Sequence, residues 1–251
     1  MKHLLDCAMD IGEQMLVSGA EVHRVEDSMM RICHAMGAAR VDVFIIPSSM
    51  VITVHTPSGN IHTETRRIEM LGTDYYKLDK LNRLSRRICS GKMEMEQIRA
   101  ELDSIQSTRS YPFWAECLGY ATVAGAFSLF FGGDWRQCLV ALFIGALLRF
   151  IDLLSQKTLK NIIFSKFVSA FSITALSFAC VKMGLIGRTD EVIIGNIMLL
   201  IPGIGFTNAL RDLFTGDSIA GILRSLEAVL SAIAIAAGYF LFVFLTGGHA
   251  V

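Results

Sequence analysis

The chain has 251 residues, of which 53% are hydrophobic, and its 23 basic residues balance its 23 acidic residues. A net charge of zero gives no support for nucleic-acid binding, which needs a basic surface. The mean hydropathy of +0.50 hides a division, because residues 1–112 hold 14 of the 23 Lys and Arg side chains, whereas residues 113–251 consist mainly of long apolar runs.

The N-terminal residues do not have the pattern of a secretory signal. Asp6, Asp10 and Glu13 interrupt the apolar residues there, so no continuous apolar stretch forms. The six cysteines are scattered without a C-x-x-C spacing, which is typical of small buried residues in a reducing compartment. We therefore expect no disulfide framework, no metal site and no cofactor.

Residues 1–112 are predicted to form a small cytoplasmic α+β domain. Apolar residues spaced three and four apart predict a first helix before a second one, which a capping box of Ser18 and Glu21 starts and Gly37 ends. Three β-branched and aromatic runs then predict strands, and two further apolar stripes predict helices. The predicted strands cover residues 41–46, 51–55 and 61–68, and the later helices cover residues 74–90 and 94–106.

Polar residues of this domain form no recognisable catalytic motif. His23 lies near the start of the second helix, and His55, His62 and Glu64 belong to the strands. Catalysis or metal binding by these four side chains is conceivable, but neither H-E-x-x-H nor a nucleophile elbow is present. A solvated face with a few ion pairs is the preferred interpretation, and we assign no catalytic residue.

Residues 113–251 are predicted to form a transmembrane domain of five helices. A spanning helix needs about 20 mainly apolar residues, and five segments meet this condition. These segments cover residues 113–132, 135–154, 162–184, 191–210 and 226–246. Small residues recur inside them and are expected to let helices approach closely. They are Gly119, Gly125, Gly145, Ala146, Gly195 and Gly238. The fold class is therefore a polytopic α-helical membrane protein with an N-terminal α+β domain.

The distribution of Lys and Arg predicts the orientation of these helices. If residues 1–112 are cytoplasmic, 20 of the 23 basic residues lie inside and only Arg136, Lys182 and Arg188 lie outside. With five spans the C-terminus, Gly247 to Val251, is then expected outside.

Four segments of the sequence together resemble the threonine/serine exporter family. They are SGAEVHRVEDSM at 18–29, TRRI at 65–68, KLDKLNRL at 77–84 and PGIGFTNALRDLFTGDSIAG at 202–221, and the resemblance covers nearly the whole chain. It implies a secondary exporter of small hydroxy amino acids, driven by the proton gradient, in a bacterial-type plasma membrane. Split relatives are similar but handle C4-dicarboxylates such as succinate.

Full-length members of that family have about ten spans, so this chain resembles the larger subunit of a split exporter. The implied partners are the lipid bilayer, a small-molecule substrate and either a short hydrophobic subunit of the same family or further copies of this chain. The substrate, amino acid or dicarboxylate, stays open. The alternative function is a membrane-anchored enzyme or ligand sensor that acts through residues 1–112.

The fourth predicted span contains a break that is typical of a transporter site. Proline ends the helical hydrogen bonding, and the glycines that follow let a new half-helix direct its free N–H groups at a carboxylate. The predicted substrate-binding residues are Pro202, Gly203, Gly205, Thr207, Asn208, Arg211 and Asp212. Candidate proton carriers are Asp152, Asp217 and Glu227. Alternatively, Pro202 only kinks a packed helix, and residues 211–217 form an ordinary cytoplasmic loop.

Overall fold

The computed structural model describes residues 2–69, 71–91, 93–108, 111–158 and 161–247. These residues divide into two compact units. The first unit comprises Met1–Ser110 and Ile204–Ser225, and the second comprises Tyr111–Gly203 and Leu226–Val251. Residues 204–225, which the sequence groups with the membrane half, therefore pack with the N-terminal residues. Residues 248–251, expected outside the membrane, lie beyond the described part of the chain.

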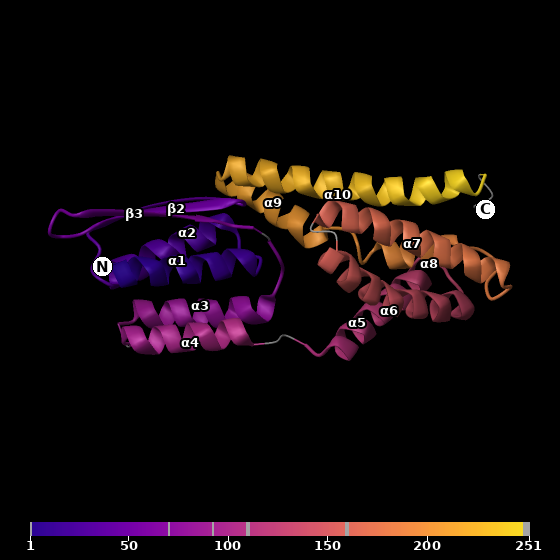
Figure 1. Cartoon of the computed structure of the whole chain (residues 1–251), viewed down its shortest axis with the longest axis horizontal. Coiled ribbons are helices and arrows are strands. Elements are labelled where there is room, and N and C mark those ends of the chain that lie inside the picture. The colour runs from indigo at the N-terminus through magenta and orange to yellow at the C-terminus, as the bar shows by residue number, and fades with distance from the viewer. Residues whose placement is uncertain (1, 70, 92, 109–110, 159–160, 248–251) are drawn as a thin grey trace. The chain divides into compact units, whose positions relative to one another are not determined.

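The first unit is an α+β domain built in three layers (Figure 1). A three-stranded antiparallel sheet of order β1-β2-β3 lies on one side of the helices α1 and α2, and the helices α3 and α4 lie on the other side. The elements are α1 (Lys2–Val17), α2 (Val22–Ala35), β1 (Arg40–Ile46), β2 (Ser49–His55), β3 (Ile61–Arg67), α3 (Tyr75–Cys89) and α4 (Met95–Ser107). The unit also includes α9 (Gly203–Thr215) and the first turns of α10 (Ser218–Leu245).

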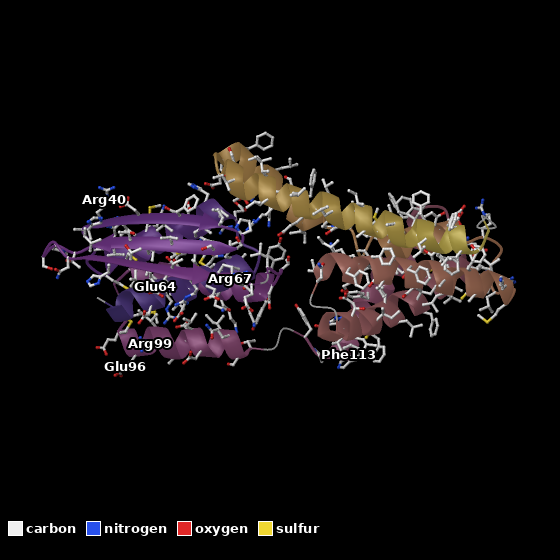
Figure 2. The ribbon with its side chains drawn as sticks, turned by 45° about the horizontal axis from the view of Figure 1, so that its top comes forward. Arg40, Glu64, Arg67, Glu96, Arg99 and Phe113 are labelled. Carbon is white, nitrogen blue, oxygen red and sulfur yellow. The ribbon has the colours of Figure 1, made fainter. Side chains whose placement is uncertain are left out.

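The position of α1 and α2 in the middle layer explains their burial. Met9, Ile11 and Leu16 of α1 are fully buried, although they point to different sides of the helix. The central strand β2 alternates as the sequence predicts, with Met50, Ile52 and Val54 inward and the residues between them partly exposed. Charged side chains cover the surface of this unit, and Arg40, Arg67, Glu96 and Arg99 are all exposed (Figure 2).

The predicted capping box at the start of α2 is wrong. Glu21 is the N-cap residue itself, its side chain makes no capping hydrogen bond, and Ser18 is buried before the helix begins. The residues next to the helix start predict that a neighbouring side chain caps it. The N–H of Val22 donates instead to Asp212, which lies 190 residues further along the chain.

The second unit contains the membrane helices. They are α5 (Phe113–Phe130), α6 (Trp135–Thr158), α7 (Ile162–Lys182), α8 (Asp190–Ile197) and the remainder of α10. Four helices of the described chain are long and apolar enough to cross a membrane: Phe113–Phe130, Trp135–Ser155, Ile162–Lys182 and Ser218–Leu245.

The fifth predicted span is not confirmed. The segment 191–210 is divided between α8 and α9, and the interruption ends at Pro202, as the sequence predicts. Helix α8 has eight residues, which extend only about 12 Å and cannot cross a hydrocarbon layer about 30 Å thick.

Four of the predicted small residues allow the helices of the second unit to approach closely. One is Gly238 on α10, where a Cβ atom would lie 2.4 Å from the Phe167 carbonyl oxygen on α7, and the other three lie on α5, α6 and α8. A Cβ atom at Gly125 would lie 2.7 Å from Cγ of Leu142, and one at Gly145 would lie 2.8 Å from the Tyr120 carbonyl oxygen. A Cβ atom at Gly195 would lie 2.6 Å from the Ala124 carbonyl oxygen. These glycines therefore set the distances between α5, α6 and α8.

Replacement of Gly195 by alanine should destabilise the second unit. The new methyl group would press against the backbone of α5, which cannot rotate away, and overpacking of this kind costs about 1–3 kcal/mol. Gly119→Ala is the matched control, because nothing lies within 4 Å of its Cβ position and alanine favours a helix over glycine. Thermal unfolding of both variants in detergent should give a lower midpoint for Gly195→Ala alone, and equal midpoints would contradict the close packing of α8 on α5.

Candidate functional site

A cavity of about 580 Å³, mainly apolar but with charged side chains in its wall, lies in the second unit. Helices α5 and α6 supply most of its wall, and Tyr111 completes it. The other lining residues are Ala115, Glu116, Gly119, Tyr120, Arg149 and Asp152. Such a cavity is large enough for a metabolite of a few carbon atoms, and charged residues inside membrane helices usually line a water-filled path or a binding site.

Arg149 is the central cation of this cavity. Its Nε and Nη2 atoms donate to one carboxylate oxygen of Glu116 at 3.0 and 2.7 Å, and Nη1 lies 3.6 Å from Asp152. The guanidinium also lies over the ring of Tyr120, with 5.7 Å between its central carbon and the ring centroid. Only 16% of the Arg149 side chain is exposed. A guanidinium in this position can bind a carboxylate through two parallel hydrogen bonds.

Two further groups interact with Asp152, and one of them, Lys166, lies outside the lining of the cavity. The Tyr120 hydroxyl hydrogen-bonds to Asp152, and the ammonium group of Lys166 on α7 interacts electrostatically with the same carboxylate. Glu116 lies in the first turn of α5, Arg149 near the end of α6 and Lys166 near the start of α7. Because consecutive spanning helices run in opposite directions, these three charged groups belong to the same membrane face.

A second buried carboxylate lies near the other ends of these helices. Glu191, in the first turn of α8, is 8% exposed and accepts a hydrogen bond of 2.6 Å from Nε2 of Gln137. Arg188 forms an ion pair with it. Gln137 also shares reciprocal 2.8 Å hydrogen bonds with Asp134 at the start of α6, which orient its amide. Glu191 is thus a fully partnered acid at the opposite membrane face.

The sequence did not single out these residues as a site. Arg149 was counted only as a charge that orients the helices, and Glu116 and Glu191 were not considered. Their signal is present, however, because Arg149 and Asp152 stand three residues apart within an otherwise apolar run and therefore share one side of a helix. Of the predicted proton carriers, Asp152 lines the cavity and Glu227 is exposed on α10.

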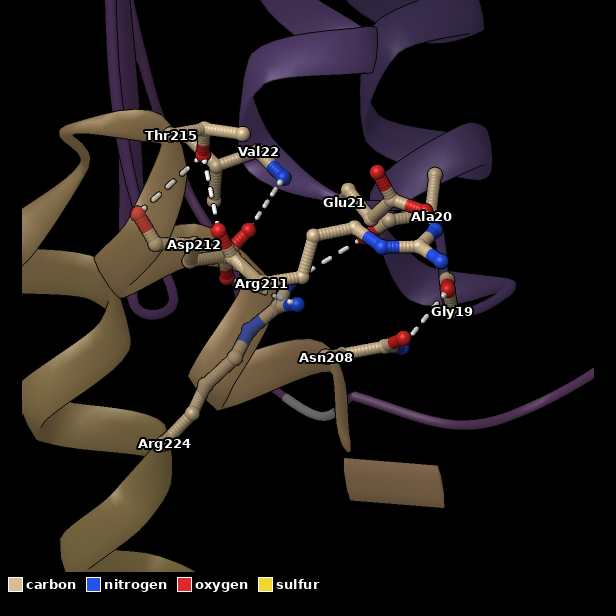
Figure 3. Close-up of polar contacts among 9 residues, drawn as sticks. All are labelled: Gly19, Ala20, Glu21, Val22, Asn208, Arg211, Asp212, Thr215 and Arg224. Carbon is tan, nitrogen blue, oxygen red and sulfur yellow. Dashed lines mark hydrogen bonds and ion pairs between the residues drawn. The ribbon is translucent and has the colours of Figure 1, made fainter. Parts of the chain in front are cut away.

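The segment after Pro202 forms a second polar cluster, which lies within the first unit (Figure 3). Asp212 on α9 is completely buried and forms an ion pair of 3.1 Å with Arg224 on α10, which is itself 7% exposed. The second oxygen of Asp212 accepts from the N–H of Val22 at 3.3 Å, and Nη2 of Arg224 donates to the carbonyl of Ala20 at 3.2 Å. Burial raises the pKa of Asp212, whereas Arg224 and the Val22 N–H oppose that rise.

Two further residues of α9 bind the same turn. Asn208 donates to the carbonyl of Gly19 at 3.2 Å, and Arg211 forms an ion pair with Glu21. Consequently every residue from Gly19 to Val22 is bonded to a residue of α9 or α10 (Figure 3). Two segments quoted for the family resemblance, 18–29 and 202–221, meet here.

The remaining predicted site residues lie around this cluster. Pro202 is partly buried before α9, and Gly203, Gly205 and Thr207 are exposed in its first turns. Asp217 lies in the turn between α9 and α10. The structure therefore joins Asn208, Arg211 and Asp212 through a common partner, the turn 19–22.

Comparison with known proteins gives consistent matches. The family model described as "Putative threonine/serine exporter" matches residues 6–246. A threonine/serine exporter of Corynebacterium glutamicum is 29% identical over 94% of this chain and 50% of its own length, and a probable one of Mycobacterium tuberculosis is 24% identical over 94% and 45%. A probable succinate transporter subunit of Escherichia coli is 24% identical over 89% of this chain and 87% of its own. The chain thus spans about half the length of the two exporters. No solved structure matches it significantly.

Loss of Arg224 should weaken the packing of α9 within the first unit and lower the stability of that unit. Arg224→Met would leave Asp212 as a buried charge without its cation, and breaking a buried pair in this way costs about 3–5 kcal/mol. Arg211→Met is the control, because its side chain is 56% exposed and such pairs contribute about 0–1 kcal/mol. Chemical unfolding of the full chain in detergent measures both variants, and similar small losses would show that the buried pair does not hold α9.

Proposed function

Because the chain belongs to the putative threonine/serine exporter family, we propose that it is a subunit of a secondary transporter for a small metabolite that carries a carboxylate. The observation that carries this proposal is the cavity around Arg149, where a nearly buried guanidinium stands among membrane helices. A cation in that position is costly unless a carboxylate accompanies it, and a transporter can supply that carboxylate from the substrate.

The substrate carboxylate would bind Arg149 in place of Glu116. The guanidinium donates two hydrogen bonds to a single oxygen of Glu116, so an incoming carboxylate with two free oxygens offers a geometry at least as good. Exchange of one carboxylate for another keeps Arg149 paired, and the displaced Glu116 side chain, which is 31% exposed, can be solvated by water. The Glu116 pair is then the resting state that protects Arg149 when no substrate is bound.

The second charged group of the substrate, either an ammonium group or another carboxylate, would determine whether Asp152 or Lys166 binds it. An α-ammonium group fits Asp152, whose carboxylate is held by Tyr120 and lies 3.6 Å from Arg149. A second carboxylate, as in a C4-dicarboxylate, would instead need the ammonium group of Lys166. The same cavity therefore distinguishes the two substrate classes by which side chain becomes essential.

Proton coupling follows from competition at Asp152. A carboxylate that binds the substrate ammonium cannot bind a proton at the same time, so proton entry would release an amino acid and substrate entry would release a proton. This exchange makes export dependent on the proton gradient. We propose Asp152 as the coupling residue, with Asp217 and Glu227 as the other acids that the sequence singles out.

A second candidate for the substrate carboxylate is the predicted segment from Pro202 to Asp212. The first turns of α9 are exposed, and nothing lies within 4 Å of the Cβ position of Gly203, so a ligand could approach this helix end, although the Gly203 N–H itself donates to the carbonyl of Ile201 at 2.8 Å. Asn208, Arg211 and Asp212 are engaged with the turn 19–22 in the present state. Substrate binding there would have to replace at least one of these contacts.

The chain would act together with a second subunit. Transporter sites commonly lie where two repeats face each other, and this chain spans about half the length of two exporters that it matches. The missing half would be a short hydrophobic protein of the same family or a second copy of this chain. The family resemblance favours a bacterial-type plasma membrane, and the Lys and Arg distribution favours residues 1–112 in the cytoplasm. This orientation would place the ends of α5, α6 and α7 that carry Glu116, Arg149 and Lys166 on the cytoplasmic side.

The alternative of an anchored enzyme or ligand sensor is less well supported. One or two apolar helices suffice for an anchor, whereas four described helices have the length and composition of spans. The description of the family also refers to export.

Replacement of Arg149 tests the transport site. With the chain and its partner subunit co-expressed in sealed vesicles, Arg149→Lys should lower substrate flux at least tenfold, because an ammonium group cannot form the two parallel hydrogen bonds. Arg211→Lys should leave flux within about twofold if its role is the exposed ion pair with Glu21. A larger loss of flux in Arg211→Lys than in Arg149→Lys would place the carboxylate site in the segment 202–212 instead. Normal flux in both variants would contradict both proposed sites.

The substrate class can be read from a second pair of substitutions. If the substrate is an amino acid, Asp152→Asn should lower flux at least tenfold and make the flux that remains independent of the proton gradient, while Lys166→Gln retains most of the flux. If the substrate is a dicarboxylate, Lys166→Gln should raise KM by at least tenfold, because the second carboxylate loses its cation. Flux of threonine and succinate in the same vesicles provides the measurement, and equal effects of the two substitutions on both substrates would contradict this division of roles.

A further inference from the structure

Three side chains with metal-binding atoms meet in the first unit, outside the clusters described above. His23 and Glu26 stand three residues apart on α2, and Asp217 lies in the turn between α9 and α10. One ligand atom from each residue lies within 4.8 Å of the other two. The sequence alone gives no hint of this group, because Asp217 is separated from α2 by about 190 residues.

Glu26 is held in place by one oxygen only. Its Oε1 atom accepts a hydrogen bond of 3.0 Å from the backbone N–H of Ile45 on β1, which fixes the carboxylate beside the sheet. Burial raises the pKa of Glu26, and the negative charge of Asp217 raises it further. Two carboxylates therefore approach each other, and the imidazole of His23 beside them opposes the rise in the pKa of Glu26.

Asp217 has an oxygen that lacks a partner. Its Oδ2 atom is inaccessible to solvent and has no hydrogen bond to any residue that the structure describes, although its backbone carbonyl accepts from Gly221 at the start of α10. Arg224 belongs to the neighbouring cluster around Asp212, where it is already engaged with Asp212 and Ala20. A buried carboxylate oxygen without a donor is unfavourable unless a ligand completes it.

We propose that His23, Glu26 and Asp217 bind a divalent first-row transition metal ion, Zn²⁺ or Mn²⁺. One imidazole nitrogen and two carboxylate oxygens form a ligand set that these ions accept, with water in the remaining positions. Ligand atoms around such an ion lie about 3–3.5 Å apart, given bonds of about 2.0–2.2 Å. Small rotations of side chains would bring the present group to that spacing. Mg²⁺ and Ca²⁺ prefer oxygen ligands only and do not need His23.

The ion would join α2 to the turn before α10. Both segments already meet through Asp212, so the ion would add a second link at the same junction, present only when the metal is bound. It would also neutralise the two carboxylates that otherwise repel each other. Binding would therefore stabilise the first unit and would weaken as pH falls, because protons compete for all three ligands.

The test is titration of the full-length chain with the metal alone. The chain, purified in detergent and freed of metal with a chelator, should bind one equivalent of Zn²⁺ in calorimetry and should melt at a higher temperature with Zn²⁺ present. His23→Ala and Asp217→Asn should each weaken binding at least about tenfold. Glu26→Gln should do the same while it keeps an acceptor for the Ile45 N–H, so its fold is retained.

Matched controls lie on the same unit. Asp27→Asn removes an exposed carboxylate of α2 that pairs with Arg31, and His62→Ala removes a histidine of β3 outside the group, so both should bind Zn²⁺ as the unchanged chain does. The proposal is overturned if the unchanged chain binds no Zn²⁺ or Mn²⁺, or if the three site variants bind as tightly as the controls. It is equally overturned if Mg²⁺ binds as well as Zn²⁺ and His23→Ala has no effect, because the site would then be formed by oxygen atoms alone. Transport activity does not enter this test, so its outcome is independent of the proposed function.

Discussion

The first unit depends on the burial of one charge, the carboxylate of Asp212. A buried carboxylate is stable only if cations and N–H groups surround it, and here Arg224 and the N–H of Val22 do so. These partners require α9, the start of α10 and the start of α2 to meet at one point. Helix α9 therefore uses a polar side for its attachment and leaves an apolar stripe exposed, formed by Phe206, Leu210 and Phe214.

The second unit also keeps a charge away from water by means of ion pairs, in this case a cation among apolar helices. Its helices are apolar because they cross lipid, yet Arg149 is kept there by Glu116 and Asp152. The packing of α5, α6 and α8 through glycines makes the bundle tight elsewhere, and the ion pairs of Arg149 and of Glu191 lie near the opposite membrane faces. A charge that is costly to bury and can exchange its partner is suited to bind a charged ligand reversibly.

Periodicity was sufficient to predict most of the fold. The alternation in β2, the helices of the α+β domain, four spans and the interruption at Pro202 follow from local patterns. Contacts between distant residues were not predictable in this way. The cap of α2 was assigned to Ser18 and Glu21 because they are neighbours, whereas the structure satisfies Val22 through Asp212. The window at 191–210 was counted as a span because hydropathy averages over a break that divides it into two short helices.

The same limit explains why the sequence directed attention away from the cavity. Segments 18–29 and 202–221 carry the family resemblance, and their polar residues bind each other in the first unit. In this chain the two segments therefore fix the junction of α9 and α10 with the start of α2. It does not define the substrate. On the proposed function, substrate choice belongs to Asp152, which the sequence singles out only as a candidate proton carrier, and to Lys166, which enters the sequence analysis only as a positive charge that orients the helices. A single cavity could then serve an amino acid or a dicarboxylate through a change in one helix position, with the junction at Asp212 left intact.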